Sequence, residues 1–421
     1  TEAGNYPITL EATHGISTQT DAKLFALTVL EDIGGSVLGI DETAGGPLPA
    51  DVRPDGSTAV ILWQDQIEDP DDPGIYFWTR FRLVKAGPDG QIDFDIDIPG
   101  QCTQHVGCRM TSAIDRKSSV RIMPDGGAAI AFLGDGLAFV SRYAPNGDEL
   151  LSQPIPSIGE HYWLTAFAVA PDGRIALAAF DGGEESGVYC PDIERGFYSR
   201  GSSYVEFDAD GASIRAHEYL TEGSCQEAAL GLETVSTAIT GLAVDAGGNF
   251  VAVGYTAWET SGAPTYRPPE PFRIDLGSRQ PLAVTDGKLP LGLAASGNGL
   301  FVALAPAGEN GNPGYTYVLG SLVDLTATTL AAPLVCTEGL RGTAGIPGSL
   351  FSMCYDNLER LSDAGALVVS RILPSPRSAL AIVAGQGGQV FTVESRWNLD
   401  SGLYVYEIVG AVLNPDLSDP E

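Results

Sequence analysis

The sequence has little lysine and little positive charge overall. Lysine and arginine together number 23, against 54 aspartates and glutamates, which gives a net charge of −31. A field of this sign repels the phosphates of nucleic acids and of anionic lipid headgroups. We therefore expect no nucleic-acid partner and no docking on an anionic membrane, and the simplest role of the charge is solubility.

The chain also lacks a long apolar run. No stretch approaches the ~20 apolar residues of a membrane-spanning helix, so we expect no transmembrane segment. Thr1 does not begin a charged and apolar leader, and a signal peptide that has already been removed is compatible with this start. The hydrophobic content of 44% is still enough for a large core.

Motifs of common catalytic and metal centres are missing. The four histidines are scattered without H-x-H or H-E-x-x-H spacing, and the six cysteines include no C-x-x-C pair. Neither a histidine-based metal centre nor a zinc site is therefore expected. The sequence contains no G-x-S-x-G elbow, no phosphate-binding loop and no S-x-D-x-G-x-T-W box of sialidase-like enzymes, so no catalytic residue can be named.

Turns, in contrast, are abundant. The 52 glycines and 28 prolines include Pro-Asp-Gly turns between apolar runs, as in residues 169–180 (VAPDGRIALAAF). Such a turn indicates a β-hairpin, because glycine adopts the positive φ that the turn requires. A first series of these turns falls at Gly56, Gly126, Gly173, Gly248, Gly299, Gly348 and Gly388. A second series falls between them, at Gly35, Gly90, Gly147, Gly211 and Gly365.

Two tight turns per unit predict four antiparallel strands, a to d, at a period of roughly 40 to 75 residues. This pattern is typical of a β-propeller blade, and the first series predicts an all-β propeller of seven blades, with residues 1–421 as a single domain. One blade would combine 22–41 with 379–395 and so close the ring from both chain ends. Strands expected at 6–12 and 403–411 are then surplus, so eight blades is the alternative.

The repeats resemble those of secreted bacterial β-propeller proteins, whose blades read VxPDGxxxVAG followed by LDxDGxxxW. The matching stretches are 169–180, 204–211, 244–255 and 361–370. The resemblance implies an exported protein, whether secreted, periplasmic or on the cell surface. It implies no catalytic residues.

Connection lengths distinguish the two faces of the predicted disc. Strands alternate in direction, so the a–b and c–d turns lie on one face (the tight-turn face) and the b–c and d–a connections on the other (the long-loop face). The interval from Gly173 to Gly211 is 38 positions and that from Gly211 to Gly248 is 37. Insertions therefore gather on the long-loop face, and loops on a rigid scaffold usually carry binding and chemistry.

The six cysteines are also expected on the long-loop face. An even number without close pairs favours disulfides in an oxidising compartment. Many pairings are possible, and proximity in the propeller favours Cys102–Cys108, Cys190–Cys225 and Cys336–Cys354. Their expected role is to hold loops that are too long to order themselves.

Large aromatic residues gather at the same ends of the predicted strands, with Tyr189 and Tyr198 among the accompanying tyrosines. Exposed rings beside carboxylates can stack on sugars or grip a peptide. The alternative is that they cap the core beneath the loops, since large aromatic residues usually bury most of their area. The candidates for ligand contact are Trp63, Tyr76, Trp78, Trp163, Trp258 and Trp397.

One predicted loop is rich in carboxylates. Oxygen-rich loops can hold Ca²⁺, so calcium is the one cofactor that the sequence suggests, although the D-x-D-x-D-G loop is absent. A solvated acidic loop explains the composition as well. The candidate ligands are Asp65, Glu68, Asp69, Asp71 and Asp72.

These patterns favour a binding module. We expect an exported or cell-surface recognition or scaffold propeller that binds a protein or glycan partner through its long-loop face. The alternative is a carbohydrate-active hydrolase or lyase that uses paired carboxylates on that face. Such an enzyme needs two carboxyl groups about 5 to 9.5 Å apart across a pocket. Asp65 and the equivalent strand-ending aspartates, Asp135, Asp181 and Asp356, could supply that pair or line a cation site, and they could equally cap turns.

Overall fold

The structure is a computed structural model, and it describes sixteen stretches of the chain. These are residues 36–41, 48–68, 76–98, 120–134, 137–155, 161–181, 188–192, 195–229, 231–259, 268–307, 317–334, 340–354, 356–373, 377–385, 388–397 and 406–418.

Two four-stranded antiparallel sheets open the ring. The first contains β2 (Ala50–Val52), β3 (Thr58–Glu68), β4 (Tyr76–Ala86) and β5 (Ile92–Ile98). The second contains β6 (Val120–Ile122), β7 (Ala128–Gly134), β8 (Leu137–Tyr143) and β9 (Glu149–Pro154). In both, each strand pairs with the next one in the sequence, as the two series of turns predicted.

A nine-stranded sheet follows, and it comprises two units of four antiparallel strands. The first unit contains β10 (His161–Val169), β11 (Ile175–Asp181), β13 (Arg195–Phe207) and β14 (Ser213–Tyr219). The second contains β15 (Thr234–Val244), β16 (Phe250–Glu259), β17 (Glu270–Asp275) and β18 (Ser278–Pro281). Parallel pairing of β13 with β15 joins the units, and β12 (Val188–Cys190) pairs with β13. A short helix, α1 (Cys225–Ala229), lies between the units in the sequence.

The next two sheets are less regular. One contains β20 (Lys288–Ser296), β21 (Gly299–Pro306), β22 (Tyr317–Val323) and β23 (Thr326–Leu334), with β19 (Ala283–Val284) parallel to β23 and the 3-10 turn η2 (Thr285–Gly287) beside it. The other contains β24 (Leu350–Cys354), β25 (Asn357–Leu361) and β26 (Leu367–Ile372). A single antiparallel bridge from Arg341 to Phe351 takes the place of a further strand beside β24.

The closing sheet corrects the predicted arrangement of the chain ends. It contains β27 (Arg377–Ala384), β28 (Val390–Trp397) and β29 (Tyr406–Leu413), and β1 (Ser36–Asp41) pairs with β29 as its fourth strand. The segment 403–411, expected to be surplus, therefore supplies most of the third strand of this sheet. Only the end of 22–41 is a described strand, and 6–12 lies outside the described residues.

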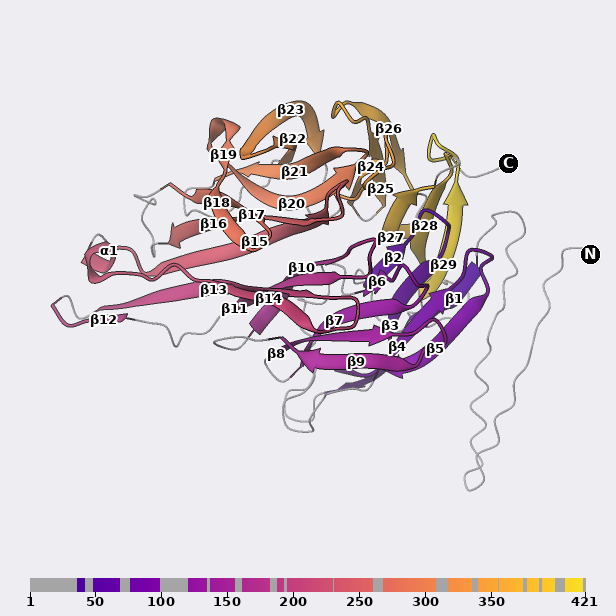
Figure 1. The fold of residues 1–421 in the computed structure, drawn as a ribbon. Helices are drawn as coiled ribbons and strands as arrows, with labels where there is room; N and C mark the ends of the chain where they lie inside the picture. Colours follow the sequence, from indigo (N-terminus) through magenta and orange to yellow (C-terminus); the bar gives the residue numbers. More distant parts are fainter. Residues whose placement is uncertain are drawn as a thin grey trace, which may run out of the picture.

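The innermost strands of the sheets surround a common axis. Packing contacts link β2, β6, β10, β15, β20, β24 and β27 into a closed circuit that returns to β2. Figure 1 shows β2, β6 and β27 side by side in the middle of the molecule. The last strands β9, β14 and β26 are largely exposed, so exposure rises from the axis outward. The predicted β-propeller is confirmed.

The number of blades depends on how two of the sheets are counted. Five hydrogen-bonded sheets have four strands or more. The count reaches the predicted seven when the nine-stranded sheet is taken as its two units and β24–β26 as a blade whose first strand is reduced to the Arg341 bridge. The circuit of seven inner strands favours this interpretation.

The tight turns share one hydrogen-bond pattern. In the turn 53–57, the amide of Arg53 donates to the carbonyl of Ser57, and the amide of Gly56 donates back to the carbonyl of Arg53. Gly56 has a φ of +92°, a conformation that glycine adopts without a Cβ clash. Asp55 accepts a hydrogen bond of 2.9 Å from the Ser57 amide, which stabilises the turn locally. The same pair of backbone bonds recurs at 87–91, 123–127, 144–148, 170–174, 208–212, 245–249, 362–366, 385–389 and 414–418.

Arginine side chains join the tight turns of neighbouring sheets. Nη1 of Arg53 donates to the carbonyl oxygen of Met123 at 2.7 Å, across 70 positions of sequence. Nη1 of Arg360 likewise donates to the carbonyl oxygen of Pro415 at 2.8 Å. Part of the scarce positive charge therefore serves to hold the tight-turn face together.

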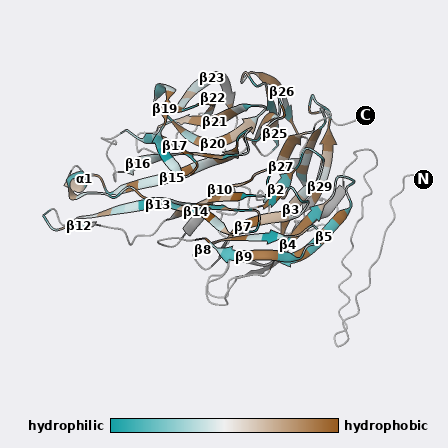
Figure 2. Ribbon diagram, in the orientation of Figure 1, coloured by the Kyte–Doolittle hydropathy of each residue, from teal (hydrophilic) through white to brown (hydrophobic). Residues whose placement is uncertain are grey.

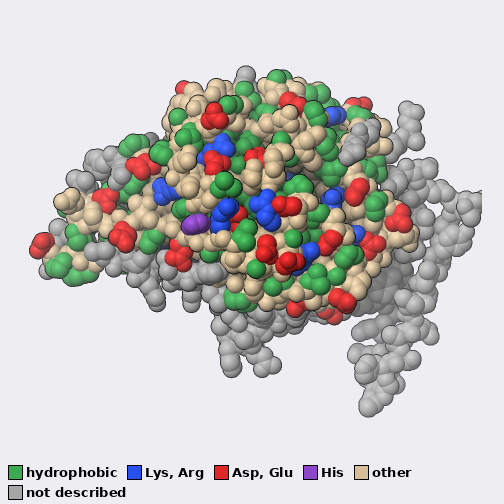
Figure 3. Space-filling view, in the orientation of Figure 1, with side chains coloured by type: hydrophobic (Ala, Val, Ile, Leu, Met, Phe, Trp, Pro, Cys, Tyr) green, Lys and Arg blue, Asp and Glu red, His purple; other side chains and the backbone are tan. Residues whose placement is uncertain are grey.

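Small apolar side chains fill the spaces between sheets. β7 begins with Ala128 and Ala129 and β11 contains Ala176, Ala178 and Ala179, all fully buried. Small residues let neighbouring sheets approach closely, and Figure 2 shows the hydrophobic colouring along the inner strands. Acidic side chains are scattered over the visible surface in Figure 3, with basic ones among them.

Candidate functional site

An extension of the nine-stranded sheet projects beyond the ring at the long-loop end of its strands (Figure 1). It consists of residues 188–192, 195–200, 221–229, 231–236 and 255–259, which we call the arm. The arm forms because β13, β15 and β16 are long strands, of 13, 11 and 10 residues. Residues 198–200 of β13 pair in parallel with 234–236 of β15, so two neighbouring blades support one another here.

A disulfide holds the arm, as predicted. It joins Cys190 at the end of β12 to Cys225 at the start of α1. Cys354 is also disulfide-bonded, and the structure leaves no cysteine free within its described ranges. Cys102, Cys108 and Cys336 lie outside the described residues, so the pairings Cys102–Cys108 and Cys336–Cys354 stay predictions.

The arm has a small hydrophobic core of its own. Phe197 and Trp258 are fully buried there, and the disulfide lies against them. Gly223 permits this packing, because a Cβ at that position would lie 1.8 Å from the Phe197 ring. The complete cluster is Cys190, Phe197, Ala228, Leu232, Val235 and Trp258.

Trp258 was expected in a loop at the surface, and the structure places it differently. It lies within β16 and none of its surface is exposed. The strand continues past the predicted end because β15 pairs with it as far as Thr234 and Glu259. Trp258 is therefore a core residue of the arm and presents no surface to a partner.

Two tyrosines cover the outer face of the arm. Tyr189 is 65% exposed and Tyr198 is 43% exposed. In the β12–β13 register, Tyr189 lies opposite Gly196. Side chains alternate along a strand, so both tyrosines lie on the face opposite the buried Phe197. A Cβ at Gly196 would approach the Tyr198 ring at 3.6 Å, which places that ring over the glycine.

A capping box anchors the helical side of the arm. The Ser224 amide donates to Oε2 of Glu227 at 2.9 Å, and the Glu227 amide donates to Oγ of Ser224 at 3.3 Å. This reciprocal pair stabilises a helix start. The helix α1 begins at Cys225, the residue after this serine. Asp192 and Glu222 are exposed on the same arm, so its surface is acidic.

The other predicted aromatic contacts all lie in strands, including Trp397, which was expected in a loop. Trp63 pairs with Phe81 across the β3–β4 hairpin, because that hairpin continues well past the predicted strand end. Tyr76 and Trp78 lie at the start of β4, Trp163 lies in β10 and Trp397 ends β28. The described contacts do not bring these residues together, and their role in ligand contact stays a prediction.

The candidate calcium ligands divide between a strand and the connection that follows it. Asp65 and Glu68 are residues of β3, whereas Asp69, Asp71 and Asp72 lie outside the described residues. Among the residues that the structure describes, no three His, Cys, Asp or Glu side chains gather so as to hold a metal ion. Calcium binding at 65–74 stays a prediction.

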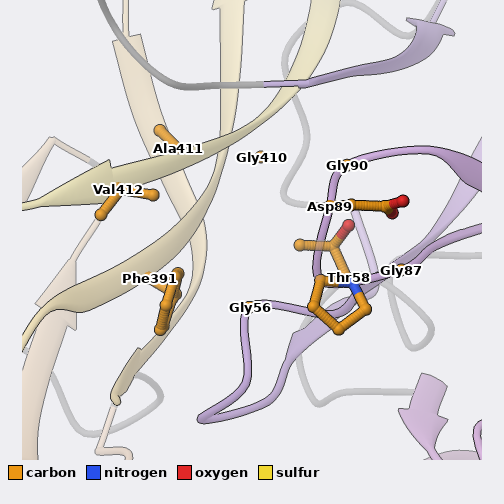
Figure 4. A pocket seen from close by; sticks show the side chains of 10 residues that line it. Gly56, Thr58, Gly87, Asp89, Gly90, Phe391, Gly410, Ala411 and Val412 are labelled. Atoms are coloured by element: carbon orange, nitrogen blue, oxygen red, sulfur yellow. The ribbon is translucent and has the colours of Figure 1, made fainter. Parts of the chain in front are cut away.

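A hollow between the first and the closing sheets lies on the tight-turn side (Figure 4). Its volume is about 100 Å³, and its lining includes Gly56, Thr58, Asp89, Phe391 and Gly410. Ligand pockets commonly measure about 300 to 1,000 Å³. This hollow therefore has room for water and not for a substrate.

Within the described ranges, no helix has the length and apolar character to cross a membrane.

Comparisons with known proteins do not assign the chain to a family. No protein-family model matches it, and no curated sequence matches it either. Similar solved structures include an α-L-arabinanase of Penicillium chrysogenum in complex with arabinobiose, at 9% identity and a TM-score of 0.42 over 90% of this chain and 98% of that one. The Pan2 WD40 domain of Neurospora crassa gives 11% identity and a TM-score of 0.42, over 90% and 95%. An apocarotenoid oxygenase of Synechocystis gives 10% and 0.45, over 93% and 95%. At such low similarity, none of them lends its activity or ligand to this chain.

Proposed function

We propose that this chain is an exported recognition or scaffold propeller that binds a protein or glycan partner through its long-loop face. The observation that carries the proposal is the pair Tyr189 and Tyr198, exposed on the same face of a disulfide-bonded arm. The ribbon that bears them buries its other face in a core closed by a disulfide. The exposed rings therefore lie on a surface that is packed from behind by a hydrophobic core.

Physical reasons favour these tyrosines as anchors. A tyrosine offers a large contact area with only two rotatable side-chain bonds, so little conformational entropy is lost when it binds. Tyrosine is enriched among residues that dominate binding energy. Gly196 lies opposite Tyr189 and beneath the Tyr198 ring, so an extended peptide or a sugar ring that binds on this face could lie against both tyrosines.

Charge and redox chemistry agree with this role. Asp192 and Glu222 give the arm an acidic border, which disfavours an anionic partner and favours a neutral or basic one. The Cys190–Cys225 disulfide is compatible with an oxidising compartment outside the cytosol. The propeller supplies the rigid platform, and the arm lengthens its long-loop end.

A screen separates this proposal from the hydrolase or lyase alternative. The full chain, immobilised through its C-terminus, would be tested on glycan and peptide arrays and, in parallel, on a panel of glycan substrates with product analysis. Retention of array members without product formation is the expected result. Turnover of any substrate would instead favour paired carboxylates on the long-loop face, and the absence of both binding and turnover would contradict the proposal.

A further inference from the structure

The outer strand β26 differs from the outer strands of the other sheets. It is the last strand of the sheet β24–β26, and among the described residues it pairs with β25 alone. Its other edge therefore makes no ladder hydrogen bonds, and it lies at the periphery of the molecule (Figure 1). A free edge can pair with a strand of another chain, so proteins usually protect it with charged residues or proline.

Four outer strands can be compared position by position, because each follows a tight turn of the same hydrogen-bond pattern, at 87–91, 144–148, 208–212 or 362–366. The sixth residue after the turn is Asp97 in β5, Pro154 in β9 and Glu218 in β14. Each of these three residues protects an edge from pairing. In β26 the same position holds Ile372.

The remaining outer strands also carry protective residues. β18 ends at Pro281, and β23 contains Pro333 and is partly covered by β19. β1 ends at Asp41. Among the described outer strands longer than two residues, β26 is therefore the one that has neither an acidic residue nor a proline.

β26 instead exposes large apolar side chains. Ile372 is 70% exposed, the highest value for a large apolar side chain in the described residues, and Val368 and Leu367 are 60% and 52% exposed. β5, β9 and β14 each expose one such side chain. Contiguous exposed apolar surface of this kind marks an interaction site.

The strand itself is firmly held. Val369 packs against the core cluster shared with the closing sheet, and Leu373, just after β26, is buried in that cluster. Nη1 of Arg371 donates a hydrogen bond to the carbonyl oxygen of Leu417, beyond β29. The exposed edge therefore belongs to a strand whose other contacts are complete, and a partner would meet a preformed surface.

The local charge differs from that of the whole molecule. The exposed residues from 364 to 372 are all uncharged, whereas the chain has a net charge of −31. A second copy would bring the same net charge, and like charges oppose association. A segment that carries basic residues is attracted by the field of the molecule. Charge thus favours a basic partner over a second copy.

We propose that the free edge of β26 binds an extended segment of another protein by strand addition, and that this segment has apolar residues at alternate positions and basic residues at its ends. Main-chain hydrogen bonds to β26 supply affinity in this mode of recognition, and alternate side chains supply specificity. Side chains of the added strand pack beside Val368 and Ile372, since residues on neighbouring strands meet on one face. This surface is separate from the arm, so either proposal can fail alone.

The test is a fluorescence anisotropy titration of a labelled peptide, KKVTVTVTKK with blocked ends, with the full chain up to the millimolar range. The control peptide has its two central residues replaced by proline, which keeps the charge and removes two N–H donors. We expect saturable binding of the first peptide and at least tenfold weaker binding of the second. Amide hydrogen exchange should slow in 367–372 on binding and stay unchanged in 149–154. Absence of saturable binding, or equal binding of the two peptides, would overturn the proposal.

Variants locate the edge and separate the possible occupants. Ile372→Glu should weaken peptide binding about tenfold or more, because an isoleucine side chain is no longer buried by the peptide. Ile372→Ser makes the same test without a new charge and should also weaken binding. Leu150→Glu is the matched control, since Leu150 is 56% exposed on the outer strand β9 and the net charge changes equally.

Undiminished binding in both Ile372 variants would contradict the site. Sedimentation velocity of the wild type should show a monomer. A dimer that Ile372→Glu abolishes would assign the edge to a second copy and would overturn the proposal.

Discussion

Nη2 of Arg174 donates a hydrogen bond of 2.7 Å to the carbonyl oxygen of Gly248, 74 positions away in the sequence. The bond joins the tight turn of one unit of the nine-stranded sheet to that of the next unit. The guanidinium also lies 5.3 Å from the centre of the Phe250 ring. Arg53 and Arg360 make the same kind of bond between other sheets. We infer that these bonds on the tight-turn face stabilise the fold.

Replacing Arg174 by Met should destabilise the protein and leave partner binding unchanged. The variant loses a hydrogen bond from a charged donor, which is typically worth about 1.5 to 3 kcal/mol. The free energy of unfolding in urea measures the loss. Arg82→Met is the control, since Arg82 and Asp95 form an exposed pair within one sheet and such pairs contribute about 1 kcal/mol or less. Equal losses of unfolding free energy in the two variants would show that the bond between sheets contributes no more to stability than an exposed ion pair.

The turns were predictable from sequence because they are local. Asp55 accepts a hydrogen bond from the amide two residues later, and Gly56 supplies the positive φ. The residues of each Pro-Asp-Gly turn are therefore enough to predict the turn. Strand ends were not predictable in this way. The β3–β4 hairpin continues past the Trp63–Phe81 pair as far as Glu68 and Tyr76, and no local signal in the sequence predicts this length.

The packing of the arm and of the ring axis brings together residues that are far apart in the sequence. Trp258 is buried against α1 and the Cys190–Cys225 disulfide. The two cysteines lie in two other connections of the chain, far from Trp258 in the sequence. Its burial could not be inferred from the residues around it. The alignment of Asp51 with Arg121 appears only when the blade register is known, although both lie two residues before a recognisable turn.

Removal of the Cys190–Cys225 disulfide should loosen the arm and spare the ring. The bond links residues 35 apart, and chain entropy predicts a loss of about 3 to 4 kcal/mol for a loop of that length. In the double variant Cys190→Ala/Cys225→Ala, amide hydrogen exchange should accelerate in residues 188–200 and 225–236. The turns 53–57 and 123–127 are the internal control and should keep their protection. Acceleration throughout the chain would show that the arm and the ring unfold as one unit.

The remaining cysteines should be paired as well. Thiol titration of the denatured, unreduced protein should detect essentially no free thiol. Peptide mapping should return Cys102–Cys108 and Cys336–Cys354 beside the pair already described. A peptide that joins Cys102 to Cys336 would contradict the blade register on which the insertions are assigned to one face.

Buried tyrosines should limit stability at high pH. Burial, reinforced by the charge of Glu149, raises the pKa of Tyr143 to about 12. Because the folded-state pKa exceeds the unfolded value of about 10, this contribution to stability is complete below about pH 10 and is lost as the pH rises through about 12. Urea unfolding at a series of alkaline pH values measures the loss, which should be shallower in Tyr143→Phe. An identical pH dependence in the two proteins would contradict this assignment.

The central claim is that the arm on the long-loop face recognises a partner. The most direct test compares retention of glycan and peptide array members by wild type and by Tyr189→Ala/Tyr198→Ala. The control is Ile92→Ala/Leu150→Ala, which removes side chains of comparable exposure, 48% and 56%, from outer strands near the tight-turn face. The account predicts that wild type and the control retain the same members and that the tyrosine variant loses about 2 kcal/mol or more of binding free energy, some 30-fold in affinity. Undiminished retention by a folded tyrosine variant, or loss confined to the control, would contradict it.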